Sequence, residues 1–356
     1  LVNLHGEESS PRTAVTSRMV TIISGRLIES TCSKLIRTRV TLMYYLEIMF
    51  GIRVGECLAG GDFHGMLANN LVILTNLETG RISLEGLLEH SKTNFLRYIN
   101  AVGTSEGECK IELAAALRAY WREAGFALRG KEGEGIVSNG YLVEGPNYYV
   151  LRVSLIAVSE PEFARLGRVL ESSESKLVRR WATVSIQRGD ERRKATGSTD
   201  KKYINVVGGV FESEDMATVT LELERAGFGD LLRQVPGPLM RGTHGVQLGY
   251  TNMPLSPQST YDTLHKLFDE AYKLANEESP DPELDLQGLR TPLWGHHSLR
   301  RFADTNARKW MDVTGASERD IDLVFGWQEQ FYSQKMQLHY ETKFTRETRV
   351  NVTRMI

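Results

Sequence analysis

The chain contains two short arginine boxes, Gly51-Ile52-Arg53-Val54-Gly55-Glu56 and His297-Ser298-Leu299-Arg300, which lie far apart in its 356 residues. A tyrosine, Tyr340, follows near the end of the sequence. A phosphodiester carries one negative charge, which becomes two in a pentavalent transition state, and arginine forks suit such an oxyanion. A phenol beside these cations can attack phosphorus and form a covalent ester. The pattern therefore indicates phosphodiester transfer.

Composition limits the class of protein before any motif is considered. Apolar residues make up 41% of the chain, so we expect one elaborated domain or two domains. The formal net charge of -2 differs from the basic balance of most nucleic-acid binders, so DNA-binding cations would have to be segregated. Three cysteines, Cys32, Cys57 and Cys109, form no CxxC pair, which argues against a disulfide framework and a zinc site. With no membrane-length apolar run and no signal peptide pattern, we expect a cytoplasmic protein without a membrane partner.

Apolar residues at helical spacing predict the helices around the two boxes. Between residues 39 and 50 they recur at steps of three and four, which marks a helix that Gly51 would end, with Arg53 directly after it. Further helices with an apolar face are predicted at residues 111–124, 261–275 and 298–310. A capping pair, Ser317 and Asp320, predicts the start of another helix.

Runs of β-forming residues predict a small sheet in the first part of the chain and a β-rich module in its middle. The first-part runs are 70–76 and 94–102, with the turn-forming Glu78-Thr79-Gly80 between them. The glycine-rich middle has further runs at 148–157, 183–187 and 203–210. We therefore expect an α+β fold. Its parts are an N-terminal linker segment, the first half of a core domain, an inserted β-containing module and the second half with a tail, at residues 1–38, 39–126, 127–260 and 261–356.

The middle of the chain also carries a basic run with aromatic residues interleaved. Its candidate DNA-binding residues are Arg179, Arg180, Arg192, Arg193 and Lys194. One interpretation is contact with a DNA backbone. The other is a solvated surface laced with salt bridges, since acidic residues are mixed through the same region. Both interpretations remain open at this point.

Taken together, the boxes resemble those of the tyrosine recombinases, the phage integrase family. The matching segments are 51–58, 297–300, Phe325-Gly326-Trp327 and the late Tyr340, in the order that the family has. Each box alone would occur by chance in many proteins, but four in order are much harder to obtain by accident. The resemblance covers residues 39–125 and 261–344. It implies a mostly helical catalytic domain with a small antiparallel sheet.

The resemblance implies that Arg53 and Arg300 hold the non-bridging oxygens of the scissile phosphate. Glu56, one helical turn after Arg53, would brace it, although a surface ion pair is the plainer interpretation of that spacing. His297 would relay the proton of the tyrosine or bind a phosphate oxygen, whereas a lone histidine is more often a capping or core residue. His296 is out of register with Arg300 and is interpreted as structural.

Two further catalytic residues follow from the resemblance. Trp327 would donate its indole N–H to a phosphate oxygen, and it could equally be a core residue. Lys92, which precedes a β-like run as the family's hairpin lysine does, would protonate the departing 5′ oxygen as general acid. Lys110 and Lys131 lie nearby in sequence, and a hairpin lysine is most often only solvated.

Tyr340 is the expected nucleophile, and Tyr332 is its competitor. Tyr340 follows Trp327 at a longer distance than is usual in the family, which a short insertion would explain. Tyr332 leaves little chain between itself and Trp327 for a tyrosine carried on a separate helix. We therefore favour Tyr340.

The resemblance implies a site-specific recombinase that forms a 3′-phosphotyrosyl intermediate for DNA integration or excision of a mobile element, without ATP, metal or other cofactor. The implied partners are double-stranded DNA, three further copies in a homotetramer, and accessory DNA-bending or directionality factors. Family members also carry an N-terminal DNA-binding domain, and only about fifty residues precede Arg53, so we expect that domain to be missing from this chain.

Two rival functions remain. A type IB topoisomerase shares the same chemistry but relaxes supercoils as a monomer without strand exchange. A catalytically inactive relative would only bind DNA and regulate, but the presence of all the polar catalytic residues argues against decay of the site.

Overall fold

The computed structural model describes residues 13–30, 33–58, 65–88, 97–102, 113–126, 135–154, 158–174, 203–209, 214–243, 250–255, 257–285, 294–315 and 317–325. The chain divides into two compact units. Unit 1 consists of Leu1–Cys57, Arg81–Leu117 and Pro257–Ile356, and unit 2 consists of Leu58–Gly80 and Arg118–Ser256. Both arginine boxes belong to unit 1.

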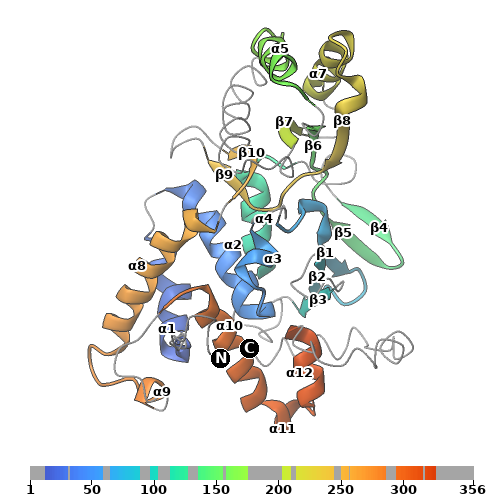
Figure 1. Cartoon of the computed structure of the whole chain (residues 1–356). Coiled ribbons are helices and arrows are strands. Elements are labelled where there is room, and N and C mark those ends of the chain that lie inside the picture. The colour runs from blue at the N-terminus through green and yellow to red at the C-terminus, as the bar shows by residue number, and fades with distance from the viewer. Residues whose placement is uncertain are drawn as a thin grey trace, which may run out of the picture. The chain divides into compact units, whose positions relative to one another are not determined.

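Unit 1 is mainly helical (Figure 1). Its helices among the described residues are α1 (Ser17–Ile22), the π-helical turn η1 (Ile23–Leu27), α2 (Lys34–Phe50), α3 (Val54–Cys57), α8 (Gln258–Ala275), α9 (Pro282–Asp285), α10 (His296–Lys309), α11 (Met311–Thr314) and α12 (Glu318–Phe325). The helix α4 (Leu113–Glu123) contributes its first residues to unit 1 and the rest to unit 2. The strands β2 (Ile82–Leu88) and β3 (Arg97–Val102) pair antiparallel.

The predicted helix before the first box is α2, and its ends follow from its sequence. The side chain of Ser33 accepts a hydrogen bond from the N–H of Ile36 and caps the start. Gly51 ends the helix with φ +53, a left-handed conformation that glycine adopts without strain. A Cβ at this position would also collide with the ring of Phe325, the last residue of α12. Gly51 is therefore required both by the turn and by the approach of α12.

The described part of the N-terminal segment is held among the helices of unit 1. Thr16 caps α1 by accepting from the N–H of Met19, and its hydroxyl donates to the buried Asp281 at 2.6 Å. The N–H of Val15 donates to the carbonyl of Ser298 in the second arginine box at 3.4 Å. The segment expected as a linker thus contacts the box directly.

The small sheet differs from the expected one. The turn residues Glu78-Thr79-Gly80 follow strand β1 (Leu71–Asn76) as predicted, but the next strand is β2, which pairs with β3. Gly86 interrupts the alternation of apolar residues in β2, and both Glu85 and Gly86 are residue types that are uncommon in strands. This strand was therefore not predicted.

Unit 2 contains the other strands among the described residues, together with the rest of α4 and two further helices. The strand β5 (Tyr141–Glu144) lies between β1 and β4 (Ile136–Ser138), antiparallel to both. A second sheet has the order β7 (Tyr203–Gly209), β6 (Tyr149–Ser154), β8 (Leu232–Pro236), and a hairpin pairs β9 (Arg241–Thr243) with β10 (Tyr250–Pro254). The helices are α5 (Glu160–Glu171) and α7 (Glu214–Arg225), and short 3-10 turns are η2 (Ala68–Asn70) and η4 (Gly229–Leu231).

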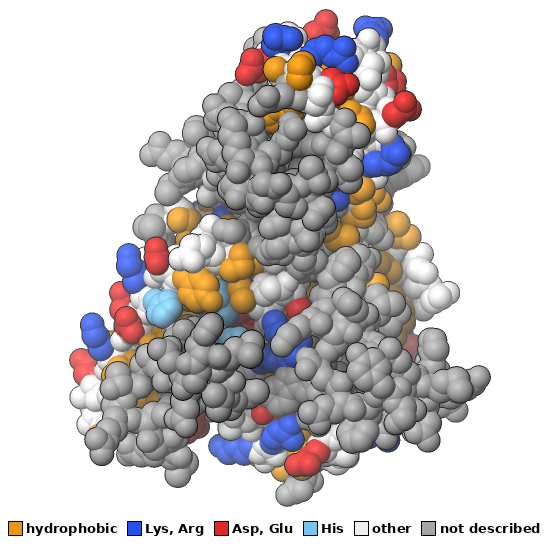
Figure 2. All heavy atoms as spheres, viewed as in Figure 1, with side chains coloured by type: hydrophobic (Ala, Val, Ile, Leu, Met, Phe, Trp, Pro, Cys, Tyr) orange, Lys and Arg blue, Asp and Glu red, His pale blue; other side chains and the backbone are white. Residues whose placement is uncertain are grey.

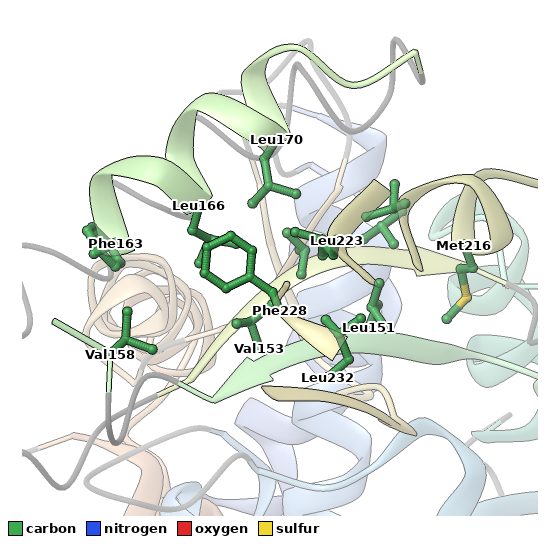
Figure 3. Packing of buried hydrophobic residues seen from close by; sticks show 13 residues of the cluster. Leu151, Val153, Val158, Phe163, Leu166, Leu170, Met216, Leu223, Phe228 and Leu232 are labelled. Atoms are coloured by element: carbon green, nitrogen blue, oxygen red, sulfur yellow. The ribbon is translucent and has the colours of Figure 1, made fainter. Parts of the chain in front are cut away.

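The core of unit 2 lies between the second sheet and its helices. Figure 3 shows Leu166 and Leu170 of α5 pointing toward the sheet residues Leu151 and Val153, with Phe228 among them. Leu223 of α7 is buried in the same cluster. Because Leu151 and Val153 alternate with the less buried Arg152, one face of β6 packs against the helices.

The fold class is confirmed as mixed helices with small antiparallel sheets. The expected boundary at residue 260 lies close to Pro257, where the last segment of unit 1 begins. The expected boundary at 126 has no counterpart, since the chain divides instead at Leu58, Arg81 and Arg118. The β-like run at 183–187 lies outside the described residues, and the idea of an insertion into a catalytic domain stays a prediction.

Candidate functional site

Arg53 and Glu56 form a coupled pair at the start of α3. The main-chain N–H of Arg53 donates to Glu56 Oε2 at 2.8 Å, which is the return half of a capping box. The guanidinium of Arg53 donates to Oε1 of the same carboxylate at 3.2 Å. The Glu56 side chain is 4% exposed and that of Arg53 is 20% exposed. Glu56 therefore holds both the backbone and the side chain of Arg53.

Arg300 connects the C-terminal ends of two helices. It is buried, its Nη1 donates to the carbonyl of Gly51 after α2, and its Nη2 donates to the carbonyl of Phe325 at the end of α12 at 2.5 Å. Helix C-termini have carbonyls without helical partners and a partial negative charge, which a cation stabilises. The side chain of the second box thereby reaches the residue two positions before Arg53.

The two adjacent histidines of the second box have different surroundings. The N-terminus of α10 is at His296, so His297 lies in the first turn, three residues before Arg300 as expected. His297 is exposed, whereas His296 is buried. The interpretation of His296 as structural fits this burial, and its partners had not been predicted.

Glu47 and Thr260 are those partners. Nδ1 of His296 lies 2.8 Å and 3.0 Å from the two carboxylate oxygens of Glu47, and Nε2 lies 3.0 Å from the hydroxyl of Thr260. Tyr261 packs edge-on to the imidazole, with ring centroids 5.0 Å apart. Desolvation raises the pKa of the fully buried Glu47, and His296 partly opposes this shift. The position of Glu47 within the apolar run of α2 is the sequence signal that could have indicated a buried polar contact.

Cys57 is buried at the end of α3, and its thiol is a free cysteine. Burial raises its pKa, and the nearby carboxylates Glu47 and Glu56 raise it further. The thiol is therefore protonated at neutral pH and is a poor nucleophile there. Cys32 and Cys109 lie outside the described residues.

The remaining predicted site residues lie outside the part of the chain that the structure describes. The catalytic predictions outside the described residues are Lys92, Trp327 and Tyr340, together with the competitor Tyr332. The basic run is outside them as well, with Arg179, Arg180, Arg192, Arg193 and Lys194. Of the residues in the predicted boxes, the structure brings together Arg53 with Glu56, and Arg300 with Gly51 and Phe325.

The described surface of unit 1 includes no uniformly basic stripe along its longest exposed helix. Acidic and basic side chains are mixed along α8, at the left of Figure 2. These residues are Asp262, Lys266, Asp269, Glu270 and Lys273. No helix in the part of the chain that the structure describes is long and apolar enough to cross a membrane.

Comparison with known proteins gives no relative: no family model, no curated protein and no solved structure matches the chain.

Proposed function

We propose that the chain is a DNA strand transferase of the tyrosine recombinase class, which integrates or excises a mobile element at a specific site. One observation carries the proposal most strongly. The Arg300 side chain bonds to the carbonyl of Gly51, so two boxes 249 residues apart along the chain meet at one place in unit 1. An arginine braced by a carboxylate, with the second arginine box in contact beside it, suits the doubly charged transition state of a phosphodiester.

In the proposed reaction the phenol oxygen of Tyr340 attacks the scissile phosphorus, and the bond from phosphorus to the 5′ oxygen breaks. The phenol proton passes to His297, and the departing 5′ oxygen takes a proton from Lys92. The product is a 3′-phosphotyrosyl ester, which conserves the bond energy. A 5′ hydroxyl from another strand then attacks this ester and releases the tyrosine. One phosphoester bond is formed for each one broken, so the reaction needs neither ATP nor a metal.

Strand exchange also determines the proposed partners. Two DNA sites must be held together while four strands are cut, and four protomers on double-stranded DNA satisfy this requirement. Accessory DNA-bending or directionality factors would select integration or excision. The net charge of -2 predicts that this chain alone binds DNA weakly, and a tight, salt-insensitive complex would contradict that prediction.

A covalent adduct on nicked DNA tests the proposal. Duplexes from the regions that flank the coding sequence, nicked at successive positions, would trap the intermediate because the short cleaved fragment diffuses away. We expect the parent chain to give a DNA adduct on a denaturing gel and the Tyr340→Phe variant to give none. An adduct that persists in the variant would transfer the role to another residue, and a parent without any adduct would favour a binding-only regulator.

Supercoiled plasmid DNA separates the proposal from the topoisomerase alternative. A plasmid that lacks the target site is expected to stay supercoiled when it is incubated with a recombinase. Relaxation of such a plasmid by the monomer, lost in the Tyr340→Phe variant, would identify a topoisomerase with the same chemistry.

A further inference from the structure

Two contacts join α2 and α10, one helical turn apart on each helix. Glu47 and Gly51 are four residues apart at the end of α2, and His296 and Arg300 are four residues apart on α10. Residues at this spacing lie on the same face of a helix. Glu47 bonds to the His296 ring, and the Gly51 carbonyl bonds to Arg300. Two contacts on one face fix the rotation of α10 about its own axis.

This rotation determines where His297 points. Successive residues of an α-helix are rotated by about 100°. With His296 turned toward Glu47, the next side chain is directed away from α2, and His297 is exposed as this geometry requires. A change in the contact of His296 would therefore redirect His297 and Arg300 together.

Each polar atom of the buried contact has a partner. The Thr260 hydroxyl donates its single proton to the carbonyl of Pro257 at 2.7 Å, so it accepts at Nε2 of His296. Nδ1 on the other side of the ring faces the Glu47 carboxylate at 2.8 Å. Paired polar groups suit their complete burial.

We propose that Glu47, His296 and Thr260 form a positioning network, which sets the orientation of the first turn of α10 and thereby directs His297 to solvent and Arg300 to the ends of α2 and α12. The orientation is a property of unit 1 by itself. Its consequence for DNA cleavage rests on the proposed function.

Matched variants separate orientation from stability. Glu47→Leu removes the carboxylate and leaves Nδ1 of His296 without its partner, while Glu47→Gln keeps an acceptor oxygen. The double variant Glu47→Leu/His296→Leu removes both polar groups, so no buried group is left unpaired and the melting temperature is expected to recover toward that of the parent. Glu270→Gln, an exposed carboxylate on α8, is the control.

A histidine footprint tests the orientation without DNA. Each folded variant is treated briefly with diethyl pyrocarbonate below its melting temperature, and modified peptides are sequenced by mass spectrometry. In the parent, Glu47→Gln and Glu270→Gln, we expect His297 to react and His296 to be protected. Glu47→Leu is expected to lose the protection of His296. An unchanged pattern in Glu47→Leu would overturn the proposal.

The rate of adduct formation tests the consequence. At saturating nicked duplex, we expect single-turnover cleavage to slow on the order of ten-fold or more in Glu47→Leu and in the double variant, with Kd for DNA little changed, and Glu47→Gln to restore most of the rate. A double variant that regains both stability and the parent's rate would reduce the network to a structural role and overturn the proposal. A parent without any adduct would refute the proposed function, while the footprint still decides the orientation.

Discussion

Glu56 accepts two hydrogen bonds from Arg53, one from its main-chain N–H at 2.8 Å and one from its guanidinium at 3.2 Å. The first bond caps α3, and the second orients the guanidinium. Because one carboxylate makes both bonds, the direction of the Arg53 side chain is coupled to the start of the helix. An arginine held in this way loses less side-chain freedom when it binds an anion.

Loss of this carboxylate should slow DNA cleavage. We expect Glu56→Gln to reduce the single-turnover rate and Glu56→Ala to reduce it further, on the order of ten- to a hundred-fold, because the guanidinium is no longer oriented. The measurement is adduct formation on nicked duplex, with the exposed Glu278→Ala as control. An Ala variant as fast as the control would mean that Glu56 is only a structural partner of Arg53.

Replacement of Arg300 should destabilise unit 1 apart from any effect on catalysis. Lysine keeps the charge but cannot reach two carbonyls with a fixed fork, so Arg300→Lys leaves one helix end without its donor. We expect the free energy of unfolding in urea to fall by about 1–3 kcal/mol. A lysine variant as stable as the parent would show that the two carbonyls find other donors.

Gly51 should tolerate substitution less well than another left-handed glycine of the same unit. Gly51→Ala places a methyl group against the Phe325 ring, whereas Gly315 has φ +70 and open space around it. Gly315→Ala should cost about 1–2 kcal/mol for its backbone conformation alone. Gly51→Ala should cost more in urea unfolding, and equal costs would contradict the close approach of α12.

The buried Glu47 predicts a pH dependence of stability. Desolvation raises its pKa above 4.5, its ordinary value. A carboxyl whose pKa is raised in the folded state contributes stability that is fully present below the unfolded value and is lost as pH rises through the folded value. We expect the stability advantage of the parent over Glu47→Gln in urea to decrease as pH rises above 4.5. An advantage that grows with pH would show that Glu47 is held ionised.

Local sequence signals predicted several helix ends, although the helix α1 lies in the segment predicted to be a linker. Gly51 ends α2 and Gly125 follows α4 in the left-handed conformation, and Ser317 and Asp320 form the expected cap of α12. In each case a residue type with one strong backbone or capping preference stands beside an apolar periodic run. Such signals act over a few residues and need no knowledge of the fold.

Contacts between distant residues left no comparable signal. Glu47 meets His296 across 249 residues, and Arg300 donates to main-chain carbonyls, which every residue carries. Strand β2 was missed because its polar and glycine positions hide the alternation. Tertiary packing supplied these features, which local preference could not indicate.

The most direct test of the central claim is to identify the residue that carries the DNA. The covalent adduct is digested with nuclease and protease, and the modified peptide is sequenced by mass spectrometry. The account predicts a nucleotide 3′-phosphate on Tyr340. A nucleotide on Tyr332 would correct the nucleophile alone, whereas attachment to a serine, histidine or carboxylate, or no adduct on the native site, would contradict a tyrosine strand transferase.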